Sequence, residues 1–134
     1  MSRSFILLAA ALASPAIATG PPGIWFASDS ASLRPADHGI HDNAAAWLRS
    51  VGAPSVCITA GADRSGSRGY NLRLSRTRGE AVRRELVRRG IPASSIVVRA
   101  YGEDRTMSGL PDGVADDMDR YAMVFAGPNG CPSG

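Results

Sequence analysis

The sequence predicts a single α/β domain in two layers, with two helices packed on one mixed four-stranded sheet. Short apolar runs of β type alternate with two segments of helical periodicity, in the order strand, helix, strand, helix, strand, strand. The chain has 134 residues, of which 44% are hydrophobic, and this is enough for one globular core. Packing helices on one sheet is a common way for a small domain to bury such elements.

The first half of this pattern is a short strand and an amphipathic helix. The opening strand is Ile24 to Phe26, and the helix runs from about Pro35 to Ser50. Proline suits the first turn of a helix, and Gly52 followed by Pro54 ends it. We expect Trp47 to be a core residue, because it belongs to an apolar stripe at helical spacing that comprises Ile40, Ala44, Trp47, Leu48 and Val51.

The central stretch, residues 57–86, places polar residues where a strand ends and a helix begins. A buried run from Val56 to Ile58 leads through small residues to Asp63 at the strand end. Gly66 and Gly69 should give the next loop backbone conformations that a side chain would resist. In the helix predicted from Tyr70 to Arg89, an amide, a hydroxyl and a guanidinium share one face, from Asn71, Ser75 and Arg78. A carboxylate from Asp63 that faces these three groups is an arrangement suited to binding a small zwitterion.

The same helix should bury Leu74, Val82 and Leu86 against the sheet, with the small Gly79 among them. Glycine in a helix costs about 1 kcal/mol relative to alanine, so Gly79 is unfavourable for the helix alone. The other faces carry a run of arginines that is typical of a solvated surface, namely Arg73, Arg76, Arg83, Arg84, Arg88 and Arg89. The net charge of +3 is too small to indicate a nucleic-acid partner, and binding to an anionic polymer stays open.

The rest of the chain supplies two strands. Ile96 to Tyr101 is the third strand, a loop follows over residues 102–117, and Met118 to Ala126 is the closing strand before a turn-rich tail over 127–134. His38 and His41 have no partner motif, so we assign neither a catalytic role. Two cysteines and two histidines without ligand spacing predict neither a metal site nor a cofactor.

Residues 1–18 have the pattern of a secretory signal. Arg3 precedes an apolar run from Phe5 to Ala13, and Ala16-Ile17-Ala18 is a cleavage site of the A-x-A type. An uncleaved N-terminal anchor is the alternative. We therefore expect an exported, periplasmic protein with a short linker over 19–22, no lipid anchor, and no membrane span in the mature chain.

Export changes the interpretation of the two cysteines, because disulfides persist in oxidising compartments. Cys57 opens the central strand and Cys131 follows the closing strand. If these two strands are antiparallel neighbours, the thiols meet at one edge of the sheet and can pair. Two unpaired thiols are the alternative.

Several motifs, in order, resemble the OmpA-like peptidoglycan-binding domain. The chain has D-x-x-G-S at Asp63 to Ser67, and then Y-N-x-x-L-S-x-x-R from Tyr70 to Arg78. The opening strand, the segment from Ile91 to Glu103, and Asp119-Arg120-Tyr121 near the C-terminus are also similar to the family pattern. The resemblance covers residues 23–126 and implies an OmpA-C-like βαβαββ fold.

The resemblance implies a non-catalytic module that binds the diaminopimelate zwitterion of the peptidoglycan stem peptide and associates with the outer membrane or cell wall. Asp63 would bind the ammonium and Arg78 the carboxylate, with Arg120 nearby and Asn71 at the ligand or the loop. Gly66, Ser67 and Ser75 would support this site. Plainer interpretations remain: an Asp63–Arg78 ion pair that fastens the loop, and helix bracing by the polar residues of the first turns.

The chain also departs from the family pattern. Where the family usually has G-H-T-D, this chain has Ala60-Gly61-Ala62-Asp63, so the histidine and threonine are missing, and Tyr121 replaces a second arginine. The second hypothesis is therefore a periplasmic protein-interaction module with weakened or lost peptidoglycan binding, whose partners are other envelope proteins. An enzyme is the third hypothesis, and we reject it because no nucleophile–base or paired-carboxylate arrangement is visible.

Overall fold

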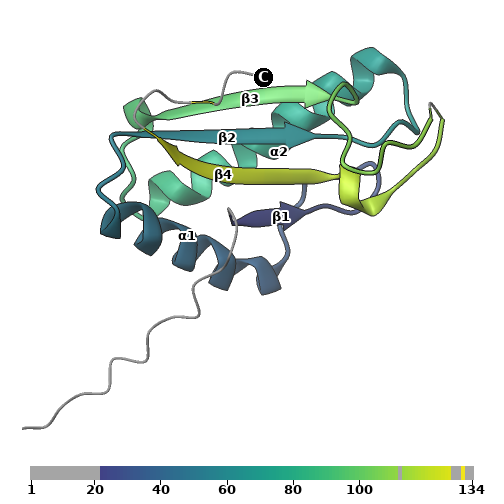
Figure 1. The fold of residues 1–134 in the computed structure, drawn as a ribbon. Helices are drawn as coiled ribbons and strands as arrows, with labels where there is room; N and C mark the ends of the chain where they lie inside the picture. The colour runs from purple at the N-terminus through teal and green to yellow at the C-terminus, as the bar shows by residue number, and fades with distance from the viewer. Residues whose placement is uncertain (1–21, 112, 128–130, 132–134) are drawn as a thin grey trace, which may run out of the picture.

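The computed structural model describes residues 22–111, 113–127 and 131. Its main elements follow the predicted order (Figure 1): β1 (Gly23–Trp25), α1 (His38–Ser50), β2 (Ser55–Gly61), α2 (Arg68–Arg88), β3 (Ile96–Gly102) and β4 (Tyr121–Gly127). Short 3₁₀ turns precede α1, β3 and β4. The predicted signal sequence and most of the linker lie outside the described residues.

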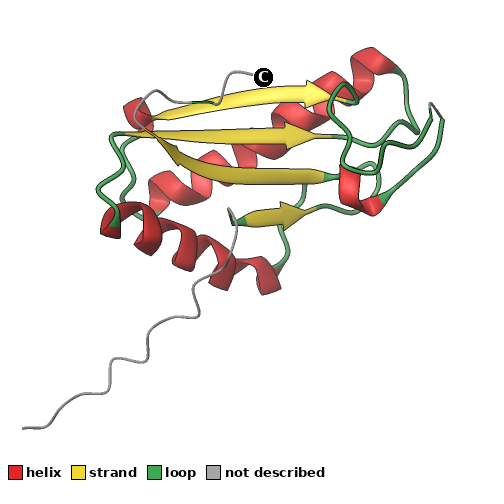
Figure 2. Cartoon of the chain, in the orientation of Figure 1, coloured by secondary structure: helices red, strands yellow, loops and turns green. Residues whose placement is uncertain are grey.

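The four strands form one mixed sheet with the order β1-β4-β2-β3. β2 and β3 are parallel, as expected for strands joined by a crossover helix, whereas β4 is antiparallel to both β1 and β2. The helices form the second layer (Figure 2). The predicted α/β architecture with helices packed on a mixed four-stranded sheet is confirmed.

The hydrophobic core lies between the sheet and the helices. Ile58 and Ala60 from β2 are fully buried and belong to one cluster with Val82 and Leu86 from α2. Leu48 joins this cluster from α1. The described members of this cluster fall between residues 24 and 124.

Gly79 lies where α2 passes closest to the sheet. A Cβ added at this position would approach Cγ1 of Val98 to 2.5 Å, which real structures do not tolerate. The glycine that is unfavourable for helix propensity therefore allows close packing of α2 on β3.

The predicted position of Trp47 is wrong. Its side chain is 37% exposed, and Val51 at the end of the same stripe is 53% exposed. The buried side of α1 is formed instead by smaller residues and a histidine: His41, Ala44, Ala45 and Leu48. These alanines let α1 lie close to the core, and Trp47 is thereby turned to the flank of the helix. Leu74 of α2 is also only half-buried.

Cys57 and Cys131 form a disulfide, with 4.7 Å between their Cα atoms. Cys57 pairs with Phe125 across the antiparallel β2–β4 ladder, so Cys131, six residues after Phe125, returns to the same end of the sheet. The predicted pairing of the two thiols is present.

The closing strand begins at Tyr121 and not at Met118. Residues Asp117–Asp119 form a short 3₁₀ turn, which begins with Asp116 accepting a hydrogen bond from the Met118 amide. Asp119 is held out of the strand because its carboxylate accepts hydrogen bonds from the backbone amides of Met107 and Ser108, at 2.6 and 2.8 Å. No helix within the described residues is long and apolar enough to cross a membrane.

Candidate functional site

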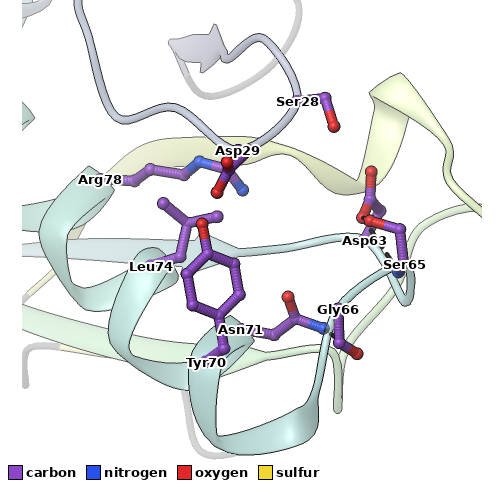
Figure 3. Close-up of a pocket in the computed structure, with 9 residues that line it drawn as sticks. All are labelled: Ser28, Asp29, Asp63, Ser65, Gly66, Tyr70, Asn71, Leu74 and Arg78. Atoms are coloured by element: carbon purple, nitrogen blue, oxygen red, sulfur yellow. Dashed lines mark hydrogen bonds between the residues drawn. The ribbon is translucent and has the colours of Figure 1, made fainter.

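A cavity of about 410 Å³ lies where the end of β2, the start of α2 and the loop after β1 meet (Figure 3). Three of the four predicted ligand-binding residues line it, Asp63, Asn71 and Arg78, and so does the predicted supporting residue Gly66. The wall is completed by Ser28, Asp29, Ser65, Tyr70 and Leu74. The central stretch of the sequence thus forms most of one site.

Asp63 follows β2 directly and is only 4% exposed. Its Oδ1 accepts hydrogen bonds from the amide and hydroxyl of Ser65, at 3.1 and 2.5 Å, and its Oδ2 accepts one from Nη1 of Arg120 at 2.9 Å. Burial opposes ionisation of Asp63, but these hydrogen bonds outweigh it and hold the pKa of the carboxyl below its usual value. The carboxylate is therefore charged and fixed in place at neutral pH.

Arg78 is fully buried, which is unusual for an arginine. Its guanidinium donates to three backbone carbonyls, those of Ser30 (2.9 Å), Gly61 (3.1 Å) and Ala27 (3.2 Å), and lies 5.3 Å from the centre of the Phe26 ring. Burial lowers its pKa to about 10, against the opposing influence of Asp63, so the group stays cationic at neutral pH. Three of its five N–H groups are used in this way, and the other two have no hydrogen-bond partner among the described residues.

Arg120 completes the charged cluster from the start of β4. Its Nε donates to the Phe26 carbonyl at 2.9 Å while its Nη1 holds Asp63. Among the described residues, Asp63 forms its ion pair with Arg120 and not with Arg78. The proposed structural ion pair between Asp63 and Arg78 is therefore not observed, and Arg120 lies behind Asp63 instead of lining the cavity.

Asn71 fixes the loop that forms the cavity wall. Its Nδ2 donates to the Gly66 carbonyl at 3.2 Å and to Oε2 of Glu103 at 2.9 Å. Neither Gly66 nor Gly69 has a positive φ, so the predicted need for special backbone conformations is wrong. A glycine is needed at position 66 because the Asn71 side chain lies close to its backbone: an added Cβ would be 2.9 Å from Oδ1 of Asn71.

Two further predicted residues have structural contacts. The Ser67 hydroxyl accepts a hydrogen bond from the Tyr70 amide and caps the start of α2. The Ser75 hydroxyl donates to the Leu72 carbonyl at 2.8 Å and accepts from the Gly102 amide at 2.9 Å. Ser75 thereby joins α2 to the end of β3.

The prediction from sequence missed Asp29, the second carboxylate of the cavity. Asp29 lies in the loop after β1 beside the guanidinium of Arg78, and its charge favours the cationic form of that group. Its φ of 53° is in the left-handed region, where aspartate is one of the better tolerated residues. The S-D-S sequence of this loop was the available signal, but it has no periodicity that would place it near Arg78.

The described residues contain no group of three or more His, Cys, Asp or Glu side chains that could hold a metal ion. The cavity instead offers fixed charges of both signs. Asp29 and Asp63 are anionic, Arg78 is cationic, and Tyr70 and Leu74 give the wall an apolar part. Such a site can bind a small group that carries both an ammonium and a carboxylate.

Comparison with known proteins identifies the family of the chain. The sequence model of the OmpA family matches residues 25–117. The chain is similar to the peptidoglycan-associated lipoproteins of Rhizobium meliloti (32% identical over 107 residues, covering 80% of this chain and 61% of the relative) and Agrobacterium fabrum (30% over 107 residues, 80% and 60%). It therefore spans about six tenths of the length of these relatives.

Solved structures show the same fold. The crystal structure of the peptidoglycan-associated lipoprotein from Burkholderia pseudomallei superposes with a TM-score of 0.69 at 25% identity, covering 77% of this chain and 87% of that one. The prediction that the chain is a binding protein and not an enzyme is confirmed by these relationships. Because the family pattern matches most of the chain in sequence and in fold, the protein belongs to the OmpA family.

Proposed function

We propose that the protein is a non-catalytic module that binds peptidoglycan through the diaminopimelate side chain of the stem peptide. The observation that carries the proposal is the cavity in which a buried, cationic Arg78 lies beside two carboxylates, Asp29 and Asp63. The names of the similar lipoproteins support peptidoglycan as the partner.

In this proposal the two ends of the cavity bind the two charges of one ligand carbon. The two N–H groups of Arg78 that no carbonyl occupies donate to the ligand carboxylate. Asp63 accepts from the ligand ammonium, since Oδ2 receives only one hydrogen bond from Arg120 and retains a lone pair. Asp29 lies beside Arg78, at the end of the cavity that binds the ligand carboxylate, and its charge supports the cationic form of the guanidinium there. Both sets of hydrogen bonds are charge-assisted and thus stronger than neutral ones.

This arrangement selects diaminopimelate against lysine. Lysine at the same position of a stem peptide carries the ammonium but lacks the second carboxylate, so it would leave the buried Arg78 without its anionic partner. An unpaired buried charge costs more free energy than the lost hydrogen bonds alone. Peptidoglycan of the diaminopimelate type should therefore bind and peptidoglycan of the lysine type should not.

Binding of this kind would hold the domain at the cell wall. Together with the predicted signal over residues 1–18, it supports our proposal that the protein is periplasmic, with the outer membrane and other envelope proteins as its neighbours. The predicted domain limits, 23–126 with a tail over 127–134, stay part of this proposal.

One observation favours the second candidate, a protein-interaction module. The charged groups of the site are already bound within the protein, Asp63 by Ser65 and Arg120, and Arg78 by three carbonyls. Such a site can be retained because its internal contacts stabilise the fold, even when it binds no ligand. In that case the cavity would not bind the zwitterion, and partner binding would not depend on Asp63.

The test is co-sedimentation with purified sacculi, using protein that begins at residue 19. Wild-type protein should pellet with sacculi of the diaminopimelate type and stay in solution with sacculi of the lysine type. Asp63→Asn and Arg78→Lys keep the size of the side chains while removing the charge or the planar donor set, and both should abolish pelleting.

The matched control is Asp42→Asn on α1, which removes an exposed carboxylate far from the cavity and should pellet like wild type. Circular dichroism and thermal unfolding must show that each variant is folded. If folded wild-type protein ignores diaminopimelate-type sacculi, or if the Asp63 variant binds as well as wild type, the proposed function is wrong and the interaction module is favoured.

A further inference from the structure

The outward surface of α2 carries a strong positive charge. Seven arginines and two glutamates give this helix a formal charge of +5, whereas the whole chain carries +3. All other residues together are therefore net negative. Five of the arginines lie away from the sheet and form what we call the basic stripe: Arg73, Arg76, Arg83, Arg84 and Arg88.

The helical repeat explains the direction of the stripe. The buried face of α2 includes Asn71, Ser75 and Arg78, and at 100° per residue Arg73 and Arg84 lie on the opposite side. From Arg73 to Arg88 the stripe extends over about 22 Å of helix. The basic stripe is thus separate from the ligand cavity, although the same helix supplies both.

Several groups of the stripe are not neutralised within the protein. Arg73, Arg76 and Arg84 are exposed, and their guanidinium groups have no ion pair or hydrogen bond among the described residues. Arg83 and Arg88 lie near the two glutamates of the helix, at 3.6 Å from Glu80 and 3.0 Å from Glu85. At least three unpaired cations therefore point outward from one helix.

Exposed apolar side chains accompany these charges. Leu72 is 42% exposed and Val87 is 39% exposed, and the helical repeat puts them on the same flank as Arg76 and Arg83. Val87 also lines an open hollow of about 510 Å³ at the C-terminal half of α2, together with Arg83, Arg84, Glu85, Arg88 and Ala93. The surface therefore combines guanidinium groups with apolar contact area.

We propose that the basic stripe docks on the phosphate headgroups of an anionic membrane surface. Guanidinium groups match phosphate oxygens in charge and in bidentate geometry. A convex helix of this length suits a flat partner better than a small molecule. Leu72 and Val87 would gain nothing from a soluble polyanion, but they can enter the boundary between headgroups and acyl chains, as apolar residues of interfacial helices do.

The experiment measures binding to vesicles by sedimentation at low ionic strength. Vesicles contain either zwitterionic phosphatidylcholine alone or a mixture with anionic phosphatidylglycerol. Protein and variants begin at residue 19, because the apolar run from Phe5 to Ala13 would itself enter lipid. Wild-type protein should bind the anionic vesicles only.

Two sets of variants test the stripe. The triple variant Arg73→Gln, Arg76→Gln, Arg84→Gln should weaken binding about a hundred-fold, since each basic residue near such a surface contributes roughly a factor of five. The control triple Arg34→Gln, Arg99→Gln, Arg105→Gln removes the same charge from exposed positions outside α2 and should weaken it far less. Glu80→Gln removes a carboxylate from within the stripe and should strengthen binding.

Heparin, a soluble polyanion, serves to distinguish docking on a membrane surface from general attraction to negative charge. Leu72→Ser with Val87→Ser should reduce vesicle binding while leaving retention on immobilised heparin unchanged. Equal losses from both triple variants, or binding to heparin without binding to vesicles, would overturn the proposal. Sacculus binding should be unchanged in the α2 triple variant, so failure here is distinguishable from failure of the proposed function.

Discussion

The guanidinium of Arg120 holds the carboxylate of Asp63 at 2.9 Å, although the two residues lie 57 positions apart. Arg120 directly precedes β4 and Asp63 comes shortly after β2, and these strands are antiparallel neighbours. The ion pair therefore joins the closing strand to the loop that forms the cavity. Together with the hydrogen bonds from Ser65, this ion pair keeps Asp63 charged in a place where burial alone would favour the neutral acid.

Replacing Arg120 should destabilise the protein and change its response to acid. Arg120→Gln leaves the Asp63 carboxylate buried without its cation, which we expect to cost about 1–3 kcal/mol of unfolding free energy. The folded pKa of Asp63 is below its unfolded value, so its stabilisation is present above pH 4 and is lost as the pH falls through the folded pKa. In Arg120→Gln this loss should begin at a higher pH.

Urea unfolding between pH 2 and 6 measures this effect. Asp104→Asn, which alters an exposed ion pair with Arg68, is the matched control and should follow the wild-type curve. Identical pH dependence in wild type and Arg120→Gln would show that Arg120 does not hold Asp63 in solution.

His41 should make the protein less stable in mild acid. It is 1% exposed, and neither ring nitrogen has a hydrogen-bond partner among the described residues. Burial, helped by the nearby Arg89 and opposed by Glu85 and Asp37, lowers its pKa below 6.5. The unfolded state therefore binds the proton first, and stability falls as the pH drops below 6.5 toward the folded pKa, by up to about 1.4 kcal/mol per pH unit.

The check compares His41→Leu with His38→Leu by thermal unfolding from pH 5 to 8. His41→Leu should remove most of the pH dependence in this window. His38 is exposed, so its replacement should keep that dependence. A His41 variant that loses stability in acid just as wild type does would exclude this residue as the cause.

The disulfide should contribute a large share of the stability. It closes a loop with a sequence separation of 74 residues, for which the chain-entropy relation gives about 4–5 kcal/mol as an upper value. Cys131→Ser should lower the unfolding free energy in guanidinium chloride toward this amount. Reductant should have the same effect on wild type and no effect on the variant; an equal response of both would mean that the bond is not formed.

Gly79→Ala should destabilise the protein, in contrast to the usual effect of this change in a helix. Propensity favours alanine by about 1 kcal/mol, but the added methyl group would lie 2.5 Å from Cγ1 of Val98, and overpacking of this kind costs about 1–3 kcal/mol. Val98→Ala should rescue the variant in a double-mutant cycle.

Gly69→Ala supplies the comparison for this prediction. Its Cβ would meet only the flexible end of Arg73, at 3.5 Å, so this change should be neutral or stabilising. If both glycine variants are stabilised alike, the close approach of α2 to β3 does not limit residue 79.

The order of elements could be predicted because the signals are local. Periodicity, helix-ending glycines and prolines, and short apolar runs each depend on neighbours in sequence. The disulfide followed from placing Cys57 on the central strand and Cys131 just beyond the antiparallel strand next to it. The cavity also followed in part, since Asp63, Asn71 and Arg78 lie within sixteen consecutive residues of the chain.

Features set by long-range packing could not be predicted in this way. Trp47 shares the apolar stripe of α1, but the sheet selects the neighbouring face with Ala44, Ala45 and Leu48. Asp29 enters the cavity through a loop without periodicity. The pairing of Asp63 with Arg120, and the binding of Arg78 by three carbonyls, depend on segments that meet only in the folded chain.

The most direct test of the ligand site is an NMR titration of the protein with a stem peptide that carries meso-diaminopimelate, compared with the same peptide carrying lysine. In the lysine peptide the α-amino group is part of a peptide bond, so no carbon carries both an ammonium and a carboxylate. The account predicts saturable shifts for the backbone amides of residues 63–71 and the loop around Asp29, absent with the lysine peptide and absent in Arg78→Lys. Equal shifts with both peptides, or shifts that persist in the folded Arg78 variant, would contradict recognition of the zwitterion by this cavity.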